Sequence, residues 1–98
     1  MLNGPVFYYA GYISDSGVVL QDNGYYTFTV TKNGTGIYVI NYSTPMSNNQ
    51  YSVFVTPRTN SPALATYFSQ TATSVTIYTF NSSGSAVDTR FSFMVISS

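Results

Sequence analysis

The chain has 98 residues and no net charge, because its three basic and three acidic side chains balance. Charged residues make up only 6% of it, against about 25% in an ordinary soluble domain. With no His and no Cys, it lacks most of the side chains that move protons, act as nucleophiles or bind transition metals. We therefore expect a protein that is not an enzyme and carries no cofactor.

Length and composition narrow the protein class further. Ninety-eight residues predict a single domain spanning 1–98. The 44% hydrophobic content argues against a disordered segment, which needs few apolar residues and high net charge. The longest apolar run, 6–13, is shorter than the roughly 20 residues of a membrane-spanning helix. Three cations are too few to neutralise nucleic-acid phosphates. We therefore expect neither membrane insertion nor nucleic-acid binding.

Strand-forming and turn-forming residues alternate along the whole chain. Asn33-Gly34, between two β-rich runs, is a strong hairpin signal because both residues tolerate the positive φ of a type I′ turn. Eight short strands at this spacing are typical of an all-β antiparallel sandwich or barrel, and we expect a sandwich of about seven to eight strands. The expected strands cover residues 6–13, 18–21, 25–32, 36–43, 50–56, 63–69, 74–81 and 87–96.

Two segments leave an alternative open. Residues 1–20 fit either an N-terminal arm that docks on another chain or the first hairpin of the sandwich. Ser61-Pro62 resembles a helix start, with Ser as the cap and Pro at the first helical position. Because Tyr67 and Phe68 favour strands, we expect a strand there, with a one-turn helix as the alternative.

Several strands are apolar on both faces. In 36–43 one face reads Ile, Val, Asn and the other Tyr, Ile, Tyr, and in 91–96 Phe, Phe, Val opposes Ser, Met, Ile. A sheet with one wet face alternates apolar and polar residues instead. The second faces are therefore expected to meet another layer or another subunit, and we expect a homo-oligomer. Alternatively, Tyr sits on a wet face with its hydroxyl in water.

The few charged residues suggest no catalytic or metal site. Asp15 and Asp22 occupy separate turns, where Asp commonly hydrogen-bonds its own backbone. Asp88 lies two residues from Arg90 on one expected strand, which predicts an ion pair between them. No loop has the carboxylate spacing of a calcium site. Catalytic and metal residues are therefore not expected.

Carbohydrate recognition suits this composition best. Sugar rings present C–H faces that lie on Tyr or Phe, and their hydroxyls pair with Asn, Gln or Ser. The candidate surfaces are two loops, one with Arg58 and Asn60 and the other with Asn48, Asn49 and Tyr51. Arg58 is the strongest candidate, because it is the one cation in a long loop.

A family resemblance runs through residues 24–98. It rests on a series of short strand and turn segments in a fixed order: 36–46 (GIYVINYSTPM), 49–55 (NQYSVFV), 74–78 (SVTIY), 81–84 (NSSG) and 91–96 (FSFMVI). This series resembles the β-rich modules at the C-terminal ends of bacteriophage and prophage tail-fibre proteins. The layout is also similar to H-type lectins, trimeric sandwiches that bind sugars between protomers, although their sugar-contacting residues do not align here.

The resemblance implies a homotrimeric virion protein, made in the bacterial host cytoplasm, that attaches the particle to a host cell-surface glycan. Within 98 residues there is no collar, coiled coil or fibrous repeat. We therefore expect either an excised head domain or a stand-alone virion protein. In the second case a capsid decoration protein that binds other virion proteins is the alternative. A cellular lectin is a more distant one.

Overall fold

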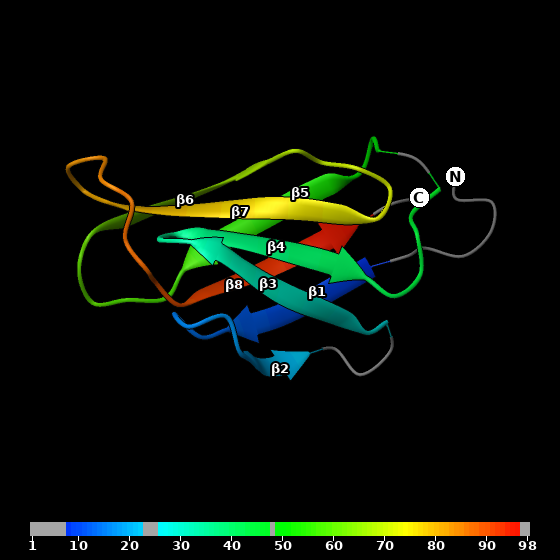
Figure 1. The fold of residues 1–98 in the computed structure, drawn as a ribbon, viewed down its shortest axis with the longest axis horizontal. Coiled ribbons are helices and arrows are strands. Elements are labelled where there is room, and N and C mark those ends of the chain that lie inside the picture. Colours follow the sequence, from blue (N-terminus) through cyan, green and yellow to red (C-terminus); the bar gives the residue numbers. More distant parts are fainter. Residues whose placement is uncertain (1–7, 23–25, 48, 97–98) are drawn as a thin grey trace.

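The computed structural model describes residues 8–22, 26–47 and 49–96 as two four-stranded antiparallel sheets (Figure 1). Sheet A has the strand order β2-β1-β8-β5 and sheet B the order β3-β4-β7-β6. No helix occurs among the described residues, so none there is able to span a membrane. The all-β antiparallel fold is thereby confirmed. The strands are β1 (Tyr8–Ile13), β2 (Val19–Asp22), β3 (Phe28–Gly34), β4 (Ile37–Tyr42), β5 (Ser52–Pro57), β6 (Ala63–Phe68), β7 (Ser74–Asn81) and β8 (Phe91–Ile96).

The core lies between the sheets and is built by period-two alternation. In β4, in β8 and in β7 as far as Thr79, every second side chain is buried, because successive side chains point to opposite faces of a strand. Aromatic rings fill much of the core. Tyr9 stacks on Tyr42 with 4.5 Å between ring centroids, and Phe28 meets Phe93 edge-on at 5.0 Å. Fully buried residues include Tyr9, Ile13, Tyr38, Ile40, Val75, Ile77, Phe91 and Val95.

The hairpin between β3 and β4 is confirmed, but its tip lies two residues beyond the expected one. Asn33 and Gly34 belong to β3, and the turn contains Thr35 and Gly36. The backbone φ is positive at Gly34 (151°) and Gly36 (68°), not at Asn33. The two glycines supply the conformations that a side chain disfavours. A Cβ on Gly36 would also lie 2.5 Å from the Thr79 carbonyl oxygen, so only Gly fits there.

The last strand begins later than the expected 87–96. Val87 still pairs with sheet B: its amide donates to the Thr79 carbonyl at 3.2 Å, and its carbonyl accepts from the Thr79 hydroxyl at 2.6 Å. The chain then crosses to sheet A, where β8 begins at Phe91. For the segment after Ser61-Pro62, the sequence allowed a strand or a one-turn helix. Residues 63–68 form the strand β6, so the strand is confirmed.

The start of the described chain belongs to the sandwich. β1 lies in the middle of sheet A, paired with β2 on one side and with β8 on the other. Residues 8–22 therefore form the first hairpin of the sheet, and residues 1–7 lie outside the described part. Tyr8 pairs with Ile96, so β1 begins beside the end of β8.

The outer faces of both sheets carry exposed apolar side chains. On sheet A, Phe54 and Met94 are paired neighbours, 56% and 38% exposed. On sheet B, Leu64 and Phe68 are 59% and 58% exposed, and Phe68 stacks on Tyr78. Within the described residues no third layer covers either face. The described residues therefore leave apolar side chains exposed on the outer face of each sheet.

Candidate functional site

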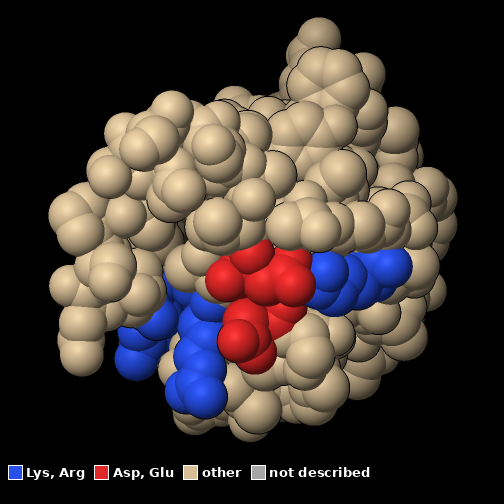
Figure 2. Space-filling model, turned by 60° about the vertical axis from the view of Figure 1, so that its left-hand side comes forward, with Lys and Arg blue, Asp and Glu red and all other residues tan. Residues whose placement is uncertain are grey.

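Five of the six charged residues gather at one end of the sandwich. Figure 2 shows the acidic side chains at the centre of this end with basic side chains on both sides of them. It lies at the left in Figure 1, where the loops after β1, β5 and β7 and the β3–β4 hairpin meet. We call it the polar end and define it by its charged residues Asp15, Lys32, Arg58, Asp88 and Arg90.

Strand register explains why residues so distant in sequence meet here. Ile13, Phe91 and Pro57 form one row across β1, β8 and β5. Arg58 follows this row and Arg90 precedes it, and the Arg58 amide donates to the Arg90 carbonyl at 2.7 Å. The two arginines therefore continue the antiparallel pairing by one step past the strand ends.

A hollow of about 380 Å³ opens among these loops. Arg58 and Asn60, two of the residues expected to contact a ligand, line it together with Thr59. Asp15, Asp88, Thr89 and Arg90 form the rest of its wall. Every residue of this wall is polar or charged, so the hollow suits a polar ligand and not an apolar one.

The side chain of Tyr12 interacts with both Arg58 and Arg90. The Arg58 guanidinium lies 4.4 Å from the centroid of the Tyr12 ring, and its Nη1 donates to the Ser92 hydroxyl at 2.8 Å. A hydrogen bond with the Tyr12 side chain raises the pKa of Arg90, and the charge of Asp15 adds to this. Tyr12 and Ser92 are paired residues of β1 and β8, so a rigid part of sheet A positions both guanidinium groups.

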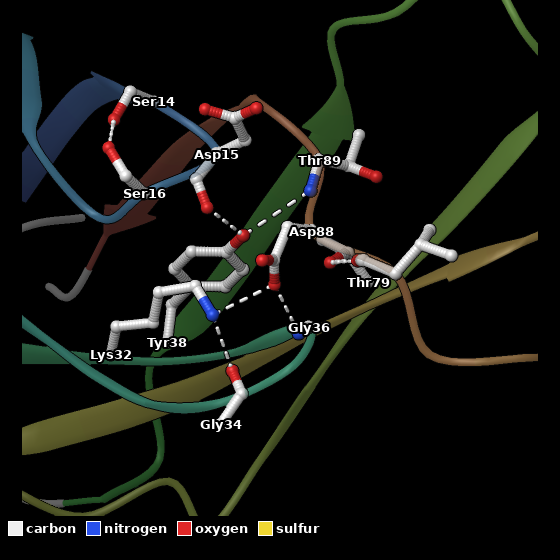
Figure 3. A network of polar contacts seen from close by, with 11 residues as sticks. Ser14, Asp15, Ser16, Lys32, Gly34, Gly36, Tyr38, Thr79, Asp88 and Thr89 are labelled. Atoms are coloured by element: carbon white, nitrogen blue, oxygen red, sulfur yellow. Dashed lines mark hydrogen bonds and ion pairs between the residues drawn. The ribbon is translucent and has the colours of Figure 1, made fainter.

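Asp88 has a different partner from the one expected. The Lys32 ammonium lies 2.8 Å from its Oδ1, and the Gly36 amide donates to the same oxygen at 2.8 Å (Figure 3). The hydrogen bond from Lys32 lowers the pKa of Asp88, and the one from Gly36 lowers it further. The expected ion pair between Asp88 and Arg90 assumed that both residues lie in one strand. This assumption was wrong, because residues 88–90 precede β8.

A buried tyrosine ties the loops of the polar end together. The hydroxyl of Tyr38 donates to the Asp15 carbonyl at 2.7 Å and accepts from the Thr89 amide at 3.3 Å (Figure 3). Burial raises the pKa of Tyr38, so it stays a neutral donor. The loop after β1 and the segment before β8 are thereby held against the same side chain.

The second expected loop lies at the other end of β5. Tyr51 precedes β5 and Arg58 follows it, and six residues at about 3.3 Å each separate them by roughly 20 Å. The Tyr51 hydroxyl is buried and donates to the Thr71 carbonyl at 2.6 Å, so Tyr51 belongs to the core and we do not carry it into the site. Asn49 is exposed at this far end. Asn48 lies outside the described residues.

Five residues of the site were not found by sequence reasoning: Tyr12, Asp15, Asp88, Thr89 and Arg90. The sequence offered one signal that could have pointed to them. Because only six residues of the chain are charged, each charged residue was worth considering as part of a site. Their meeting point depends on the strand order, which periodicity does not give.

The arrangement offers donors and acceptors to a polar ligand. Among the described residues, no three His, Cys, Asp or Glu side chains lie close enough to form a metal site. Searches against family models, curated proteins and solved structures find no match to this chain.

Proposed function

We propose that this chain is a non-enzymatic bacteriophage virion protein, a homotrimeric β-sandwich that attaches the particle to carbohydrate on the host surface. The observation that carries the binding function is the 380 Å³ hollow at the polar end, where Arg58, Asn60, Asp15 and Arg90 converge. Adjacent sugar hydroxyls act as both donors and acceptors. Carboxylate, amide and guanidinium groups provide the matching partners.

The position of the hollow suits attachment. The described chain begins at Tyr8 and ends at Ile96, which are paired at one end of sheet A. The hollow lies beyond the opposite ends of the same strands, next to Ile13 and Phe91. A particle that holds the module near the chain ends would present the polar end outward.

The exposed apolar faces support self-assembly. Isolated apolar residues on a surface are ordinary, but contiguous patches mark interaction sites. On sheet B the outward side chains of Leu64, Phe68 and Tyr78 adjoin Phe80 across paired strands. Because the chain has zero net charge, copies do not repel each other over long range.

The same faces favour a second candidate, a capsid decoration protein. In that role the apolar faces would bind capsid subunits, and the polar end would face solvent without a ligand. The two functions therefore differ in whether the polar end binds a saccharide.

Binding to an array of bacterial surface polysaccharides tests the proposal. We expect saturable binding by the purified chain, with loss of binding in Arg58→Ala and Asn60→Ala. Asn49→Ala is the matched control, because Asn49 is an exposed residue at the far end of β5. Absence of saccharide binding together with saturable binding to undecorated phage heads would favour the decoration protein.

A further inference from the structure

We infer that the saccharide bound at the polar end is acidic, and that its anionic group, a carboxylate or a phosphate, is held between Arg58 and Arg90. This inference rests on the proposed function and names the class of ligand for the same site. Both arginines are among the residues that line the 380 Å³ hollow.

The charge balance of the polar end favours an anion. It has three basic side chains (Lys32, Arg58, Arg90) and two acidic ones (Asp15, Asp88), so its net charge is +1. Asp88 is already engaged, since it accepts from both Lys32 and the Gly36 amide at 2.8 Å. Asp15 is the other carboxylate in the wall of the hollow, which also contains the two arginines.

The two arginines oppose each other in the sheet pairing. The 2.7 Å bond from the Arg58 amide to the Arg90 carbonyl makes them directly opposite residues. Like charges at directly opposite positions destabilise an antiparallel pair. Both side chains are nevertheless held on one residue, Arg58 over the Tyr12 ring and Arg90 on the Tyr12 side chain. An anion between them would offset this repulsion.

Guanidinium geometry points to an oxyanion. A guanidinium has five N–H donors in a planar fork that matches the two oxygens of a carboxylate or phosphate. The bond to the Ser92 hydroxyl engages Nη1 of Arg58 and fixes its orientation. The fork is thus held in place before a ligand arrives, which lowers the entropic cost of binding.

Arg58 also lines a second hollow of about 280 Å³ on the outer face of sheet A. Its wall includes Ala10, Tyr12, Gln21 and Ser92. The Arg58 side chain therefore borders both hollows. This geometry suits a saccharide of at least two units, with the acidic unit beside Arg90 and the next unit along β1.

Matched pairs of saccharides test the inference by titration calorimetry. The probes are trigalacturonic acid and its fully methyl-esterified form, and a phosphorylated trisaccharide and its dephosphorylated form. The first pair tests a carboxylate and the second a phosphate. The proteins are the wild-type chain, Arg58→Ala, Arg58→Lys, Arg90→Ala and the control Asn49→Ala. Arg58→Lys keeps the charge without the fork.

We expect at least one acidic probe to bind about tenfold or more tightly than its neutral partner, as a charge-assisted pair implies. Arg58→Ala and Arg90→Ala should each lose that preference, Arg58→Lys should keep part of it, and Asn49→Ala should keep it all. Equal binding of acidic and neutral forms, weakened by Arg58→Ala, would overturn the acidic ligand but leave the saccharide function standing. Failure of every probe and of the polysaccharide array would overturn both.

Discussion

The backbone amide of Arg58 donates a 2.7 Å hydrogen bond to the carbonyl oxygen of Arg90, so two of the three cations face each other across β5 and β8. These two residues lie one step past the ends of β5 and β8, at the polar end. Tyr12 contacts both of them. The pairing brings two positive charges together at the polar end and makes that end distinct from the apolar faces of the sheets.

The tip of the β3–β4 hairpin should tolerate no side chain. In Gly36→Ala the new Cβ would lie 2.5 Å from the Thr79 carbonyl oxygen, at a φ of +68°. We expect a loss of about 2–4 kcal/mol in the free energy of unfolding, because the clash adds to the backbone strain. Gly84→Ala is the control: its φ is +85°, but the space around it is open. It should lose only about 1–2 kcal/mol. Equal losses in urea denaturation would contradict the close approach at Gly36.

Acid should weaken the Lys32–Asp88 link. The pKa of Asp88 is lowered in the folded state, mainly by the hydrogen bond from Lys32. Its contribution to stability is therefore full above the unfolded value of about 3.9 and disappears as the pH falls through the folded value. Urea unfolding of the wild-type chain and Asp88→Asn at neutral pH and in acid isolates this residue from Asp15 and Asp22. We expect the wild type to be the more stable only at neutral pH; a constant difference between the two chains would argue against the link.

Tyr51 should matter for stability and not for binding. Its buried hydroxyl bonds the Thr71 and Ser74 carbonyls and accepts from the Tyr42 hydroxyl. Tyr51→Phe removes the hydroxyl that bonds the Thr71 carbonyl and the Tyr42 hydroxyl, whereas the Ser74 carbonyl still accepts from the Thr71 amide at 2.8 Å. We therefore expect a loss of about 1–3 kcal/mol in the free energy of unfolding. Tyr67→Phe, at a 44% exposed side chain, should change stability by less than about 0.5 kcal/mol. Weakened saccharide binding in folded Tyr51→Phe would return this residue to the site.

The outer face of sheet B should bind another copy of the chain. Light scattering of the purified protein is expected to give a mass near three times 10.7 kDa at two concentrations. Phe68→Ser should lower this mass, because Phe68 is 58% exposed and stacks on Tyr78 of the neighbouring strand. Ser83→Ala, in the exposed loop after β7, should leave it unchanged. A wild-type monomer would contradict the trimer.

The sequence predicted what depends on local patterns. Runs of strand-forming residues between turn clusters located all eight strands. The alternation in 36–43 and 91–96 was apolar on both faces, so it did not show which face of β4 or β8 is buried. The hairpin tip was displaced, since Gly36 rather than Asn33 takes the positive φ. Asp88 was assigned to Arg90 because a strand boundary was misplaced by a few residues. Strand order is a long-range property, and without it the sequence did not show that Asp15, Asp88 and Arg90 line the same hollow as Arg58.

The most direct test of the central claim is to map the saccharide on the protein by NMR. The chain would be titrated with a polysaccharide that it binds on the array while amide shifts are followed. The account predicts that the shifts cluster at residues 58–60 and 88–90, with Asn49 and Thr71 unmoved. A cluster at the Asn49 end, or shifts confined to the outer faces of the sheets, would contradict a binding site at the polar end.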